Sequence, residues 1–266
     1  METIAFIGGG NMAGAMAGGL VAAGRAPGSI LVVEPAAAAR EALAARLGVR
    51  VLAAADVSLG AADLVVWAVK PQAFRAAAAP CAAHVGAALQ LSVMAGVRSA
   101  AIVAATGSER VVRAMPNTPA LIGQGVAGVF ARAAVGAADR AAVDTVLAPT
   151  GERVWLDSEE TLDAVTALSG SGPAYVFYLI ESMLAAAEQM GLPPDAARRL
   201  AMQTVAGSAA LAAGSAESVE TLRLRVTSPG GTTNAAVSRL DADGVKAALV
   251  AAILAARDRA RALGEE

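Results

Sequence analysis

The stretch from Thr3 to Leu20, TIAFIGGGNMAGAMAGGL, limits the possible folds of this chain more than any other. Its apolar start, Ile4–Ile7, has the length of one buried strand and runs directly into three glycines. Gly8, Gly10 and Ala13 match the G-x-G-x-x-G/A pattern that joins a strand to a helix in dinucleotide-binding folds. The stretch therefore predicts an α/β domain with a nucleotide at this turn.

Each small residue of the turn would have its own physical task. Gly8 permits a tight turn, Gly10 lets a pyrophosphate approach the backbone, and Ala13 keeps the following helix close to the strand. That helix, from Met12 to about Ala23, would direct free N–H groups and the positive end of its dipole at the phosphates. A loop without a ligand is the alternative interpretation of so short a motif. The expected cofactor contacts are Ile7, Gly8, Gly9, Gly10, Asn11, Met12 and Ala13.

Short apolar strands alternate with helices through the first part of the chain, which predicts a doubly wound parallel sheet of the Rossmann type. The expected strands are 4–7, 30–33, 49–51, 64–69, 90–93, 110–114 and 154–156. The pattern changes near residue 158, after which only helical periodicity is found. The expected helices are 173–190, 195–213, 219–226, 232–240 and 245–263. We therefore expect a nucleotide-binding domain over 1–158 and an all-helical dimerisation domain over 159–266.

Composition excludes several classes of function. A net charge of −2 gives no sign of a nucleic-acid surface, and a single histidine, His84, excludes a histidine-cluster metal site. The single cysteine, Cys81, fits a reducing compartment, so a cytoplasmic protein is expected. The apolar run 247–256 is too short to span a bilayer. With 56% hydrophobic and 17% charged residues, the chain favours large helical interfaces between subunits.

Four polar or Gly/Pro-rich breaks stand at element ends and could carry chemistry. Ala68–Pro71 and Met115–Pro119 each follow a strand, where ligands bind in open α/β sheets. Leu168–Ala174 opens the first long helix, and Ser228–Thr233 opens another whose free N–H groups suit a carboxylate. Each break taken singly could be an ordinary cap or turn, but four in one nucleotide-binding chain favour an active site.

These motifs resemble, in order and spacing, those of the pyrroline-5-carboxylate reductases. The resemblance rests on FIGGGNMAGAMAGGL, WAVKPQ, RAMPNTPA, TALSGSGPAYVF and VTSPGGTT and covers nearly the whole chain. It implies reduction of 1-pyrroline-5-carboxylate to L-proline with NADPH or NADH, the last step of proline biosynthesis. It also implies a Rossmann domain followed by a helical domain that interlocks into a homodimer, which in many members assembles further into a pentamer of dimers.

The resemblance also implies roles for individual residues. The loop around Thr233 would hold the substrate carboxylate through backbone N–H groups, and the Thr233 hydroxyl would lie close to the ring nitrogen. Glu159 would lie near the substrate, with a helix-capping charge as the alternative. Lys70 would stand beside the cofactor, with a solvated surface lysine as the alternative. The expected catalytic residues are Thr233 and Lys70; the substrate contacts are Glu159, Ser228, Gly230, Gly231, Thr232, Thr233 and Asn117; the further cofactor contacts are Glu34, Ala68, Val69, Lys70, Pro71, Met94 and Ala95.

The chain departs from the family pattern at a few positions. The segment Ser92–Gly96, which includes Met94 and Ala95, is bulkier than the common Ala-Ala-Gly, so its cofactor contacts are less defined. Ala55 stands where several members have Asn, with Asp56 as the nearest polar residue. Arg225 stands where some members carry Asn.

Physical chemistry agrees with the reduction of an imine. The reaction needs a hydride donor, an orienting clamp for the carboxylate and a proton at nitrogen, and it needs neither a metal nor a covalent nucleophile. Alternatives are a related imine reductase, a β-hydroxyacid dehydrogenase and a non-catalytic nucleotide-binding module. The dehydrogenase would use a lysine on the helix 173–190, but the only lysines are Lys70 and Lys246. Turnover with pyrroline-5-carboxylate separates an enzyme from a binding module.

Glu34 bears on the choice of cofactor. It ends the second expected strand, where an acid can bond the ribose 2′-OH of NAD and repel a 2′-phosphate. Arg40, about one turn along the next helix, could still reach a phosphate. We expect good use of NADH without exclusion of NADPH.

Overall fold

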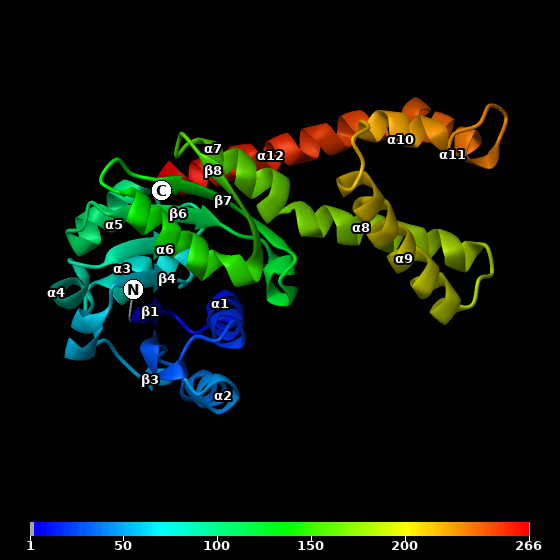
Figure 1. Cartoon of the computed structure of the whole chain (residues 1–266). Coiled ribbons are helices and arrows are strands. Elements are labelled where there is room, and N and C mark those ends of the chain that lie inside the picture. The colour runs from blue at the N-terminus through cyan, green and yellow to red at the C-terminus, as the bar shows by residue number, and fades with distance from the viewer. Residues whose placement is uncertain (1–2, 266) are drawn as a thin grey trace. The chain divides into compact units, whose positions relative to one another are not determined.

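The structure, a computed structural model, describes residues 3–265 and divides into two compact units (Figure 1). The first unit runs to Ser171 and includes the chain again from Ala256 onward. The second unit comprises Gly172–Ala255. The chain therefore leaves the first unit once and returns to it.

An eight-stranded sheet forms the centre of the first unit, in the order β3-β2-β1-β4-β5-β6-β7-β8. The strands are β1 (Ile4–Ile7), β2 (Ile30–Val33), β3 (Arg50–Leu52), β4 (Leu64–Trp67), β5 (Leu89–Ser92), β6 (Val111–Met115), β7 (Gly125–Ala131) and β8 (Gly151–Leu156). Neighbouring strands are parallel except that β7 is antiparallel to β6. The strand order reverses between β1 and β4, the switch point at which ligands bind in such sheets.

Helices cover both faces of the sheet, as Figure 1 shows. They are α1 (Asn11–Ala22), α2 (Ala37–Leu47), α3 (Phe74–Ala78), α4 (Ala82–Val85), α5 (Ser99–Thr106) and α6 (Ala137–Leu147). Because side chains alternate along a strand, Phe6 shares one buried cluster with Met16 of α1 and Val143 of α6. Its neighbour Ile7 shares the other cluster with Ile102 of α5. Two apolar layers therefore fix the carboxyl ends of the strands.

Short helical turns connect these elements. The 3-10 turns are η1 (Pro27–Ser29), η2 (Val57–Ala61), η3 (Pro71–Ala73), η4 (Thr118–Ile122) and η5 (Ala148–Thr150). After β8 come the short helix α7 (Thr161–Val165) and one π-helical turn, η6 (Thr166–Gly170). A π-helical turn is uncommon and is often found at functional sites, so the segment that leads out of the first unit is an unusual one.

The Rossmann-like sheet is confirmed, and one strand of it was missed. All seven predicted strands exist within a few residues of their expected bounds. The prediction missed β7, which runs antiparallel to β6, so a wholly parallel sheet was wrong. The sequence of β7, GVAGVFA, has glycines where a strand signal needs apolar side chains. Gly128 is required by packing, since a Cβ there would lie 2.8 Å from both methyl carbons of Val165.

The second unit consists of helices and short connections, with no strand among its described residues. It contains α8 (Gly172–Gln189), α9 (Pro194–Ala213), α10 (Val219–Arg225), α11 (Thr232–Ala242) and the first part of α12 (Val245–Glu265). Every predicted helix is confirmed with nearly its predicted bounds, because Gly and Pro mark the ends so clearly. Gly191, Gly230 and Gly244 adopt the left-handed backbone conformation in the connections between these helices.

The compact units divide at a different place from the predicted domains. Residues 159–171 pack with the sheet rather than with the helices, and a Cβ at Gly170 would lie 2.7 Å from Cε of Met115 on β6. The last part of α12 also belongs to the first unit, where Gly264 lies against the guanidinium of Arg98. The physical division therefore falls at Ser171–Gly172 and Ala255–Ala256, while 1–158 and 159–266 remain a prediction for functional domains.

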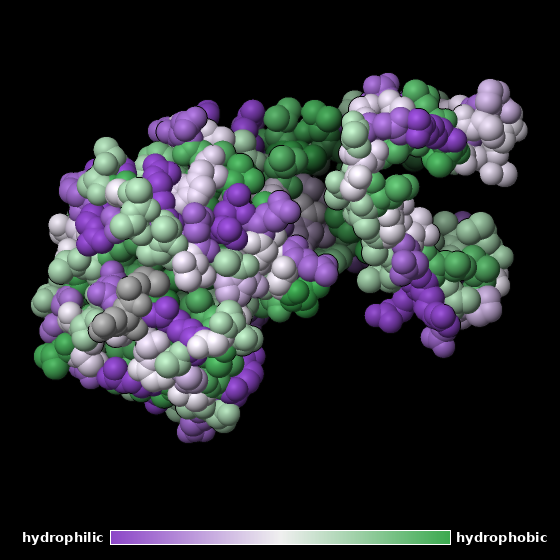
Figure 2. All heavy atoms as spheres, in the orientation of Figure 1, coloured by the Kyte–Doolittle hydropathy of each residue, from purple (hydrophilic) through white to green (hydrophobic). Residues whose placement is uncertain are grey.

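Helices of the second unit expose many apolar side chains. Figure 2 shows hydrophobic residues on the outer surface of these helices as well as on the first unit. Tyr178 is 71% exposed, Leu211 65% and Val219 72%. Apolar surface of this extent on the helices of so small a unit is typical of a face that packs against another chain.

Candidate active site

The glycine-rich turn joins β1 to α1 in the predicted manner. Gly8 adopts φ +100°, and its N–H donates to the carbonyl of Val33 over 2.9 Å. A Cβ at Gly8 would lie 2.7 Å from the carbonyl oxygen of Ala68, so only glycine fits between these strand ends. A Cβ at Gly9 would lie 2.7 Å from Leu43 Cδ1. The turn is therefore fixed by contacts on the protein side.

Gly10 differs from its neighbours because it faces open space. A Cβ there would have no protein atom within 4 Å, and Gly10 is the N-cap of α1 without a side chain to cap it. The first N–H groups of α1, at Asn11, Met12 and Ala13, have no partner within the helix, and no acidic side chain occupies its first turn. This open, uncapped helix start fits a pyrophosphate, so the residues present suit a dinucleotide.

Glu34 turns back to the same loop. One carboxylate oxygen accepts from the N–H of Gly9 over 2.9 Å, and the other accepts from the N–H of Ala36 over 2.9 Å. Arg40 Nη1 donates to the carbonyls of Glu34 and Pro35 at 2.8 and 2.6 Å. The end of β2 is thus tied to the turn after β1, with an acid and an arginine side by side where the ribose would be expected.

The carboxyl end of β4 lies beside the glycine-rich turn. Trp67 is paired with Ile7, and Ala68 donates its N–H to the carbonyl of Ile7 over 2.9 Å. The next residues, Val69 and Lys70, lead to Pro71, which opens η3, and Lys70 is exposed. The structure therefore brings the predicted cofactor segment Ala68–Pro71 to the same sheet edge as Gly8–Ala13.

Met94, one of the predicted cofactor contacts, is buried. It is 3% exposed and belongs to the buried cluster that also contains Phe74 and Ile102. Its N–H donates to Oγ of Ser92 over 3.2 Å, and Ala95 is half-buried. The large side chain of this segment, that of Met94, therefore packs in the core. The cofactor contacts of Met94 and Ala95 remain predictions.

Asn117, the polar residue of the MPNTP segment, organises the turn between β6 and β7. Its Oδ1 accepts from the N–H of Val126 over 3.0 Å, and it precedes η4. This contact explains why an amide stands at that position. Its contact with substrate remains a prediction.

Glu159 has partners that the sequence did not reveal. Its carboxylate accepts from the N–H and the hydroxyl of Ser99, both over 2.6 Å, and from Nη1 of Arg113 over 2.7 Å. Burial alone would raise the pKa of Glu159, but the bonds from Ser99 and Arg113 outweigh it and hold the pKa below its usual value. The helix-capping alternative is therefore realised at the start of α5, and a substrate contact of Glu159 remains a prediction.

Burial lowers the pKa of the Arg113 guanidinium, although its bond to Glu159 opposes the shift. This arginine stands in the middle of the sequence VVRAM of β6. A charged residue within a buried strand was the available signal for this cluster, because such a residue needs a buried partner.

The predicted carboxylate loop has the expected form in the second unit. Gly230 adopts φ +74°, and the N–H of Gly231 donates to the carbonyl of Ser228 over 3.0 Å. A Cβ at Gly231 would lie 2.7 Å from Oγ of Ser228, so the turn closes tightly. Gly231 caps α11 without a side-chain bond, so the first N–H groups of α11, including those of Thr232 and Thr233, have no partner within the helix and suit an anion.

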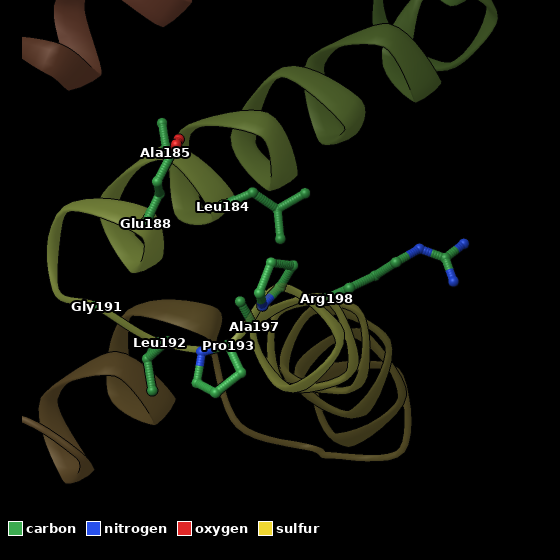
Figure 3. Close-up of a pocket in the computed structure, with 9 residues that line it drawn as sticks. Leu184, Ala185, Glu188, Gly191, Leu192, Pro193, Ala197 and Arg198 are labelled. Atoms are coloured by element: carbon green, nitrogen blue, oxygen red, sulfur yellow. The ribbon is translucent and has the colours of Figure 1, made fainter.

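A cavity of about 860 Å³ also lies in the second unit, where α8 ends and α9 begins. Figure 3 shows Leu184 of α8 pointing toward the start of α9, with Arg198 extending its guanidinium away from the other lining residues. None of the predicted site residues lines it. The cavity therefore belongs with the exposed apolar helix faces rather than with the predicted chemistry.

Residues 3–265 contain neither a metal-binding cluster nor a membrane-spanning helix. No three His, Cys, Asp or Glu side chains gather there in a way that could hold a metal ion. Within the same residues, each helix is too short or too polar to cross a membrane.

Comparisons with known proteins agree with the site. A family model described as pyrroline-5-carboxylate reductase dimerisation matches residues 159–263, and a model described as NADP oxidoreductase, coenzyme F420-dependent, matches residues 3–96. The chain is 43% identical over 265 residues to a pyrroline-5-carboxylate reductase of Pseudomonas aeruginosa, covering 99% of this chain and 97% of the relative.

Solved structures give the same result. A pyrroline-5-carboxylate reductase of Coxiella burnetii matches with a TM-score of 0.91 and 35% identity over 98% of both chains. A pyrroline carboxylate reductase of Plasmodium falciparum with NADP bound matches with a TM-score of 0.89 and 27% identity over 99% of both chains. Because the similarity runs from end to end at such identities, the chain belongs to the pyrroline-5-carboxylate reductase family.

Proposed function

We propose that this protein reduces 1-pyrroline-5-carboxylate to L-proline with NADPH or NADH. The observation that carries the proposal is the 43% identity to a named reductase over 99% of the chain. The uncapped turn at Gly10 supports the dinucleotide, and the uncapped start of α11 supports a substrate with a carboxylate. A substrate and a cofactor that are both anionic suit two separate helix N-termini.

The residues of the chain divide the work of the reaction. The turn Gly8–Ala13 holds the pyrophosphate, and Ala68–Pro71 borders the same edge, with the ammonium of Lys70 beside the cofactor. The loop 228–233 holds the substrate carboxylate through the N–H groups at the start of α11. When bound, the reduced nicotinamide supplies a hydride to the carbon of the C=N bond, and a proton must reach the nitrogen.

Thr233 is our candidate for the group at the ring nitrogen. Thr233 is the second residue of α11, so it stands in the helical turn whose N–H groups would hold the carboxylate. Pyrroline-5-carboxylate carries its carboxylate next to the ring nitrogen, so a group that bonds the one can reach the other. Orientation of this kind supplies much of the acceleration when the substrate is already electrophilic.

We also propose that the protein works as a homodimer in the cytoplasm. The match of residues 159–263 to a dimerisation model and the exposed Tyr178, Leu211 and Val219 support the dimer. The helical unit of one chain would cover the nucleotide site of its partner, and pentamers of dimers are the next level of assembly. The single, buried Cys81 is consistent with a reducing compartment.

The test is oxidation of NADH and of NADPH by the purified protein with 1-pyrroline-5-carboxylate. Formation of proline in step with oxidation is the expected result. Tight binding of either dinucleotide without turnover would instead favour the non-catalytic module, and turnover of other cyclic imines alone would favour a general imine reductase.

A further inference from the structure

The connection from β5 to α5 carries the segment Met94–Ser99, named here the β5–α5 segment. It begins two residues after the end of β5 and finishes at the first residue of α5. Gly96 adopts φ +75°, a left-handed conformation that turns the chain, and a Cβ there would lie 3.4 Å from the carbonyl oxygen of Leu263. The segment thus has little structure of its own and depends on its neighbours for its shape.

Glu159 holds the far end of this segment. The two oxygens of its carboxylate receive the N–H and the hydroxyl of Ser99, so the carboxylate caps α5 from outside the helix. Arg113 donates to the same carboxylate, and its strand position lies directly beside Ser92 at the end of β5. One carboxylate therefore connects the start of α5, the strand β6 and the end of β8 that precedes Glu159.

Asp163 makes a second attachment one turn further along. Its carboxylate accepts from Arg98 Nη2 over 2.8 Å, and its side chain is only 7% exposed. That bond raises the pKa of the Arg98 guanidinium. The same guanidinium lies against Gly264, where a Cβ would lie 2.7 Å from its Nε. Arg98 is therefore held between α7 and the last turn of α12.

Both attachments lie close in sequence to the points where the chain leaves the first unit, after Ser171, and returns to it, at Ala256. Glu159 and Asp163 stand just before the π-helical turn η6, which continues into α8 of the second unit. The last turn of α12 follows the return of the chain at Ala256. A displacement of either connecting segment would therefore disturb the contacts of Arg98 and Ser99.

We propose that Glu159 and Asp163 are positioning residues that fix the β5–α5 segment for hydride transfer. The inference rests on the proposed function, since Met94 and Ala95 are the cofactor contacts predicted within this segment. The partly buried carboxylate of Glu159, with three donors, holds its partners more rigidly than a surface ion pair would. Misplacement of a reacting group by about 1 Å can reduce turnover by roughly 100-fold.

The mildest variant is Ser99→Ala, which removes the hydroxyl bond to Glu159 and the longer bond of 3.4 Å from Arg132 Nη1 to that hydroxyl. It leaves the backbone bond from Ser99 to Glu159 and the Arg113 pair. Ser108→Ala is a matched control, because Ser108 is also buried and follows the far end of α5, where its hydroxyl donates to the carbonyl of Ala88. Amide hydrogen exchange of the free enzyme reports the segment without cofactor or substrate. We expect faster exchange over 95–100 in Ser99→Ala and wild-type exchange there in Ser108→Ala.

The stronger variants are Glu159→Gln and Asp163→Asn, each compared with Asp139→Asn. Asp139 pairs with Arg110 over 2.5 Å on the same unit but does not contact the segment. We expect kcat to fall roughly tenfold or more in the first two variants while the Kd for the dinucleotide stays close to the wild-type value. We expect kcat of Asp139→Asn to stay near wild type even where its Tm falls.

If Glu159→Gln does not fold, Ser99→Ala alone tests whether the bonds to Glu159 position the β5–α5 segment. Hydrogen exchange and kcat at wild-type values in Ser99→Ala would overturn the proposal. A loss of kcat that is proportional to the loss of Tm in every variant, Asp139→Asn included, would also overturn it. The failure of the proposed function would look different. The wild-type enzyme would then not oxidise NADH or NADPH with 1-pyrroline-5-carboxylate, while hydrogen exchange would still report whether Glu159 and Ser99 fix the segment.

Discussion

The carboxylate of Glu34 accepts a hydrogen bond of 2.9 Å from the backbone N–H of Gly9, so the acid at the end of β2 lies against the dinucleotide turn. An acid at this place bonds the ribose 2′-OH of NADH and repels the 2′-phosphate of NADPH. We expect Glu34→Ser to weaken NADH binding roughly tenfold, the loss of one charged hydrogen bond, and to strengthen NADPH binding. Calorimetric titration with both dinucleotides measures this.

Glu41→Ser provides the control for that titration, since Glu41 is an exposed acid on α2 with the same charge. A strong NADPH preference that is unchanged in Glu34→Ser would show that Glu34 does not face the ribose.

Substitution of Gly8 should lower stability, whereas substitution of Gly10 should abolish dinucleotide binding. Gly8→Ala places a side chain at φ +100° against Ala68 and should lower the unfolding free energy by about 1–3 kcal/mol. Gly10→Val places its Cβ where no protein atom lies within 4 Å, so it should keep the Tm of the wild type while abolishing dinucleotide binding. Thermal denaturation beside a binding titration separates the two. Undiminished affinity in a folded Gly10→Val protein would place the pyrophosphate elsewhere.

Thr233→Ala should reduce turnover and leave dinucleotide affinity intact. Loss of a hydrogen bond to a charged partner in the transition state costs about 1.5–3 kcal/mol, or roughly 10- to 100-fold in kcat/KM. Thr227→Ala is the comparison, because the Thr227 hydroxyl only donates to the carbonyl of Arg223 within its own helical segment. Equal weakening of cofactor binding in Thr233→Ala would indicate a structural role.

Mixed dimers should recover activity if the site is shared between subunits. Gly10→Val damages the nucleotide part and Thr233→Ala the substrate part, and each variant alone should be nearly inactive. When the two are unfolded and refolded together, mixed dimers contain one site with both parts intact, so part of the activity should return. Enzymatic assay with mass analysis of the dimers checks this. No recovery in confirmed mixed dimers would mean that each chain builds its own site.

Acid should remove the contribution of Glu159 to stability. Although burial opposes it, the bonds from Ser99 and Arg113 hold the pKa of Glu159 below its unfolded value. A lowered pKa in the folded state adds stability that is complete above the unfolded pKa and disappears as pH falls through the folded pKa. We expect wild type to exceed Glu159→Gln in urea midpoint near neutral pH, and the gap to narrow below about pH 4. A gap that is independent of pH would exclude this origin.

The elements were predictable where one local signal decides them. Apolar runs such as Leu64–Trp67 mark buried strands, and the glycine- and proline-rich breaks at Gly191 and Gly230 mark helix ends. Neither signal depends on distant residues. The strand β7 was not predictable in this way, because Gly125 and Gly128 are demanded by close packing against Thr150 and Val165. Such demands exist only once the chain has folded.

The residues of the candidate site likewise fall into those that local sequence predicts and those that depend on distant partners. Gly8, Gly10 and Gly231 could be found from the sequence because backbone geometry requires glycine in a fixed local pattern. The partners of Glu159 could not, because Ser99 and Arg113 lie 60 and 46 positions away along the chain.

The return of the chain to the first unit at Ala256 bears on how the protein is made. A ribosome completes the eight strands and the whole helical unit before it adds the residues that pack against Gly96 and Arg98. Domains usually fold in order of synthesis, N-terminal first. Gly96 and Arg98 therefore lack their contacts with Leu263 and Gly264 until the end of α12 has been synthesised.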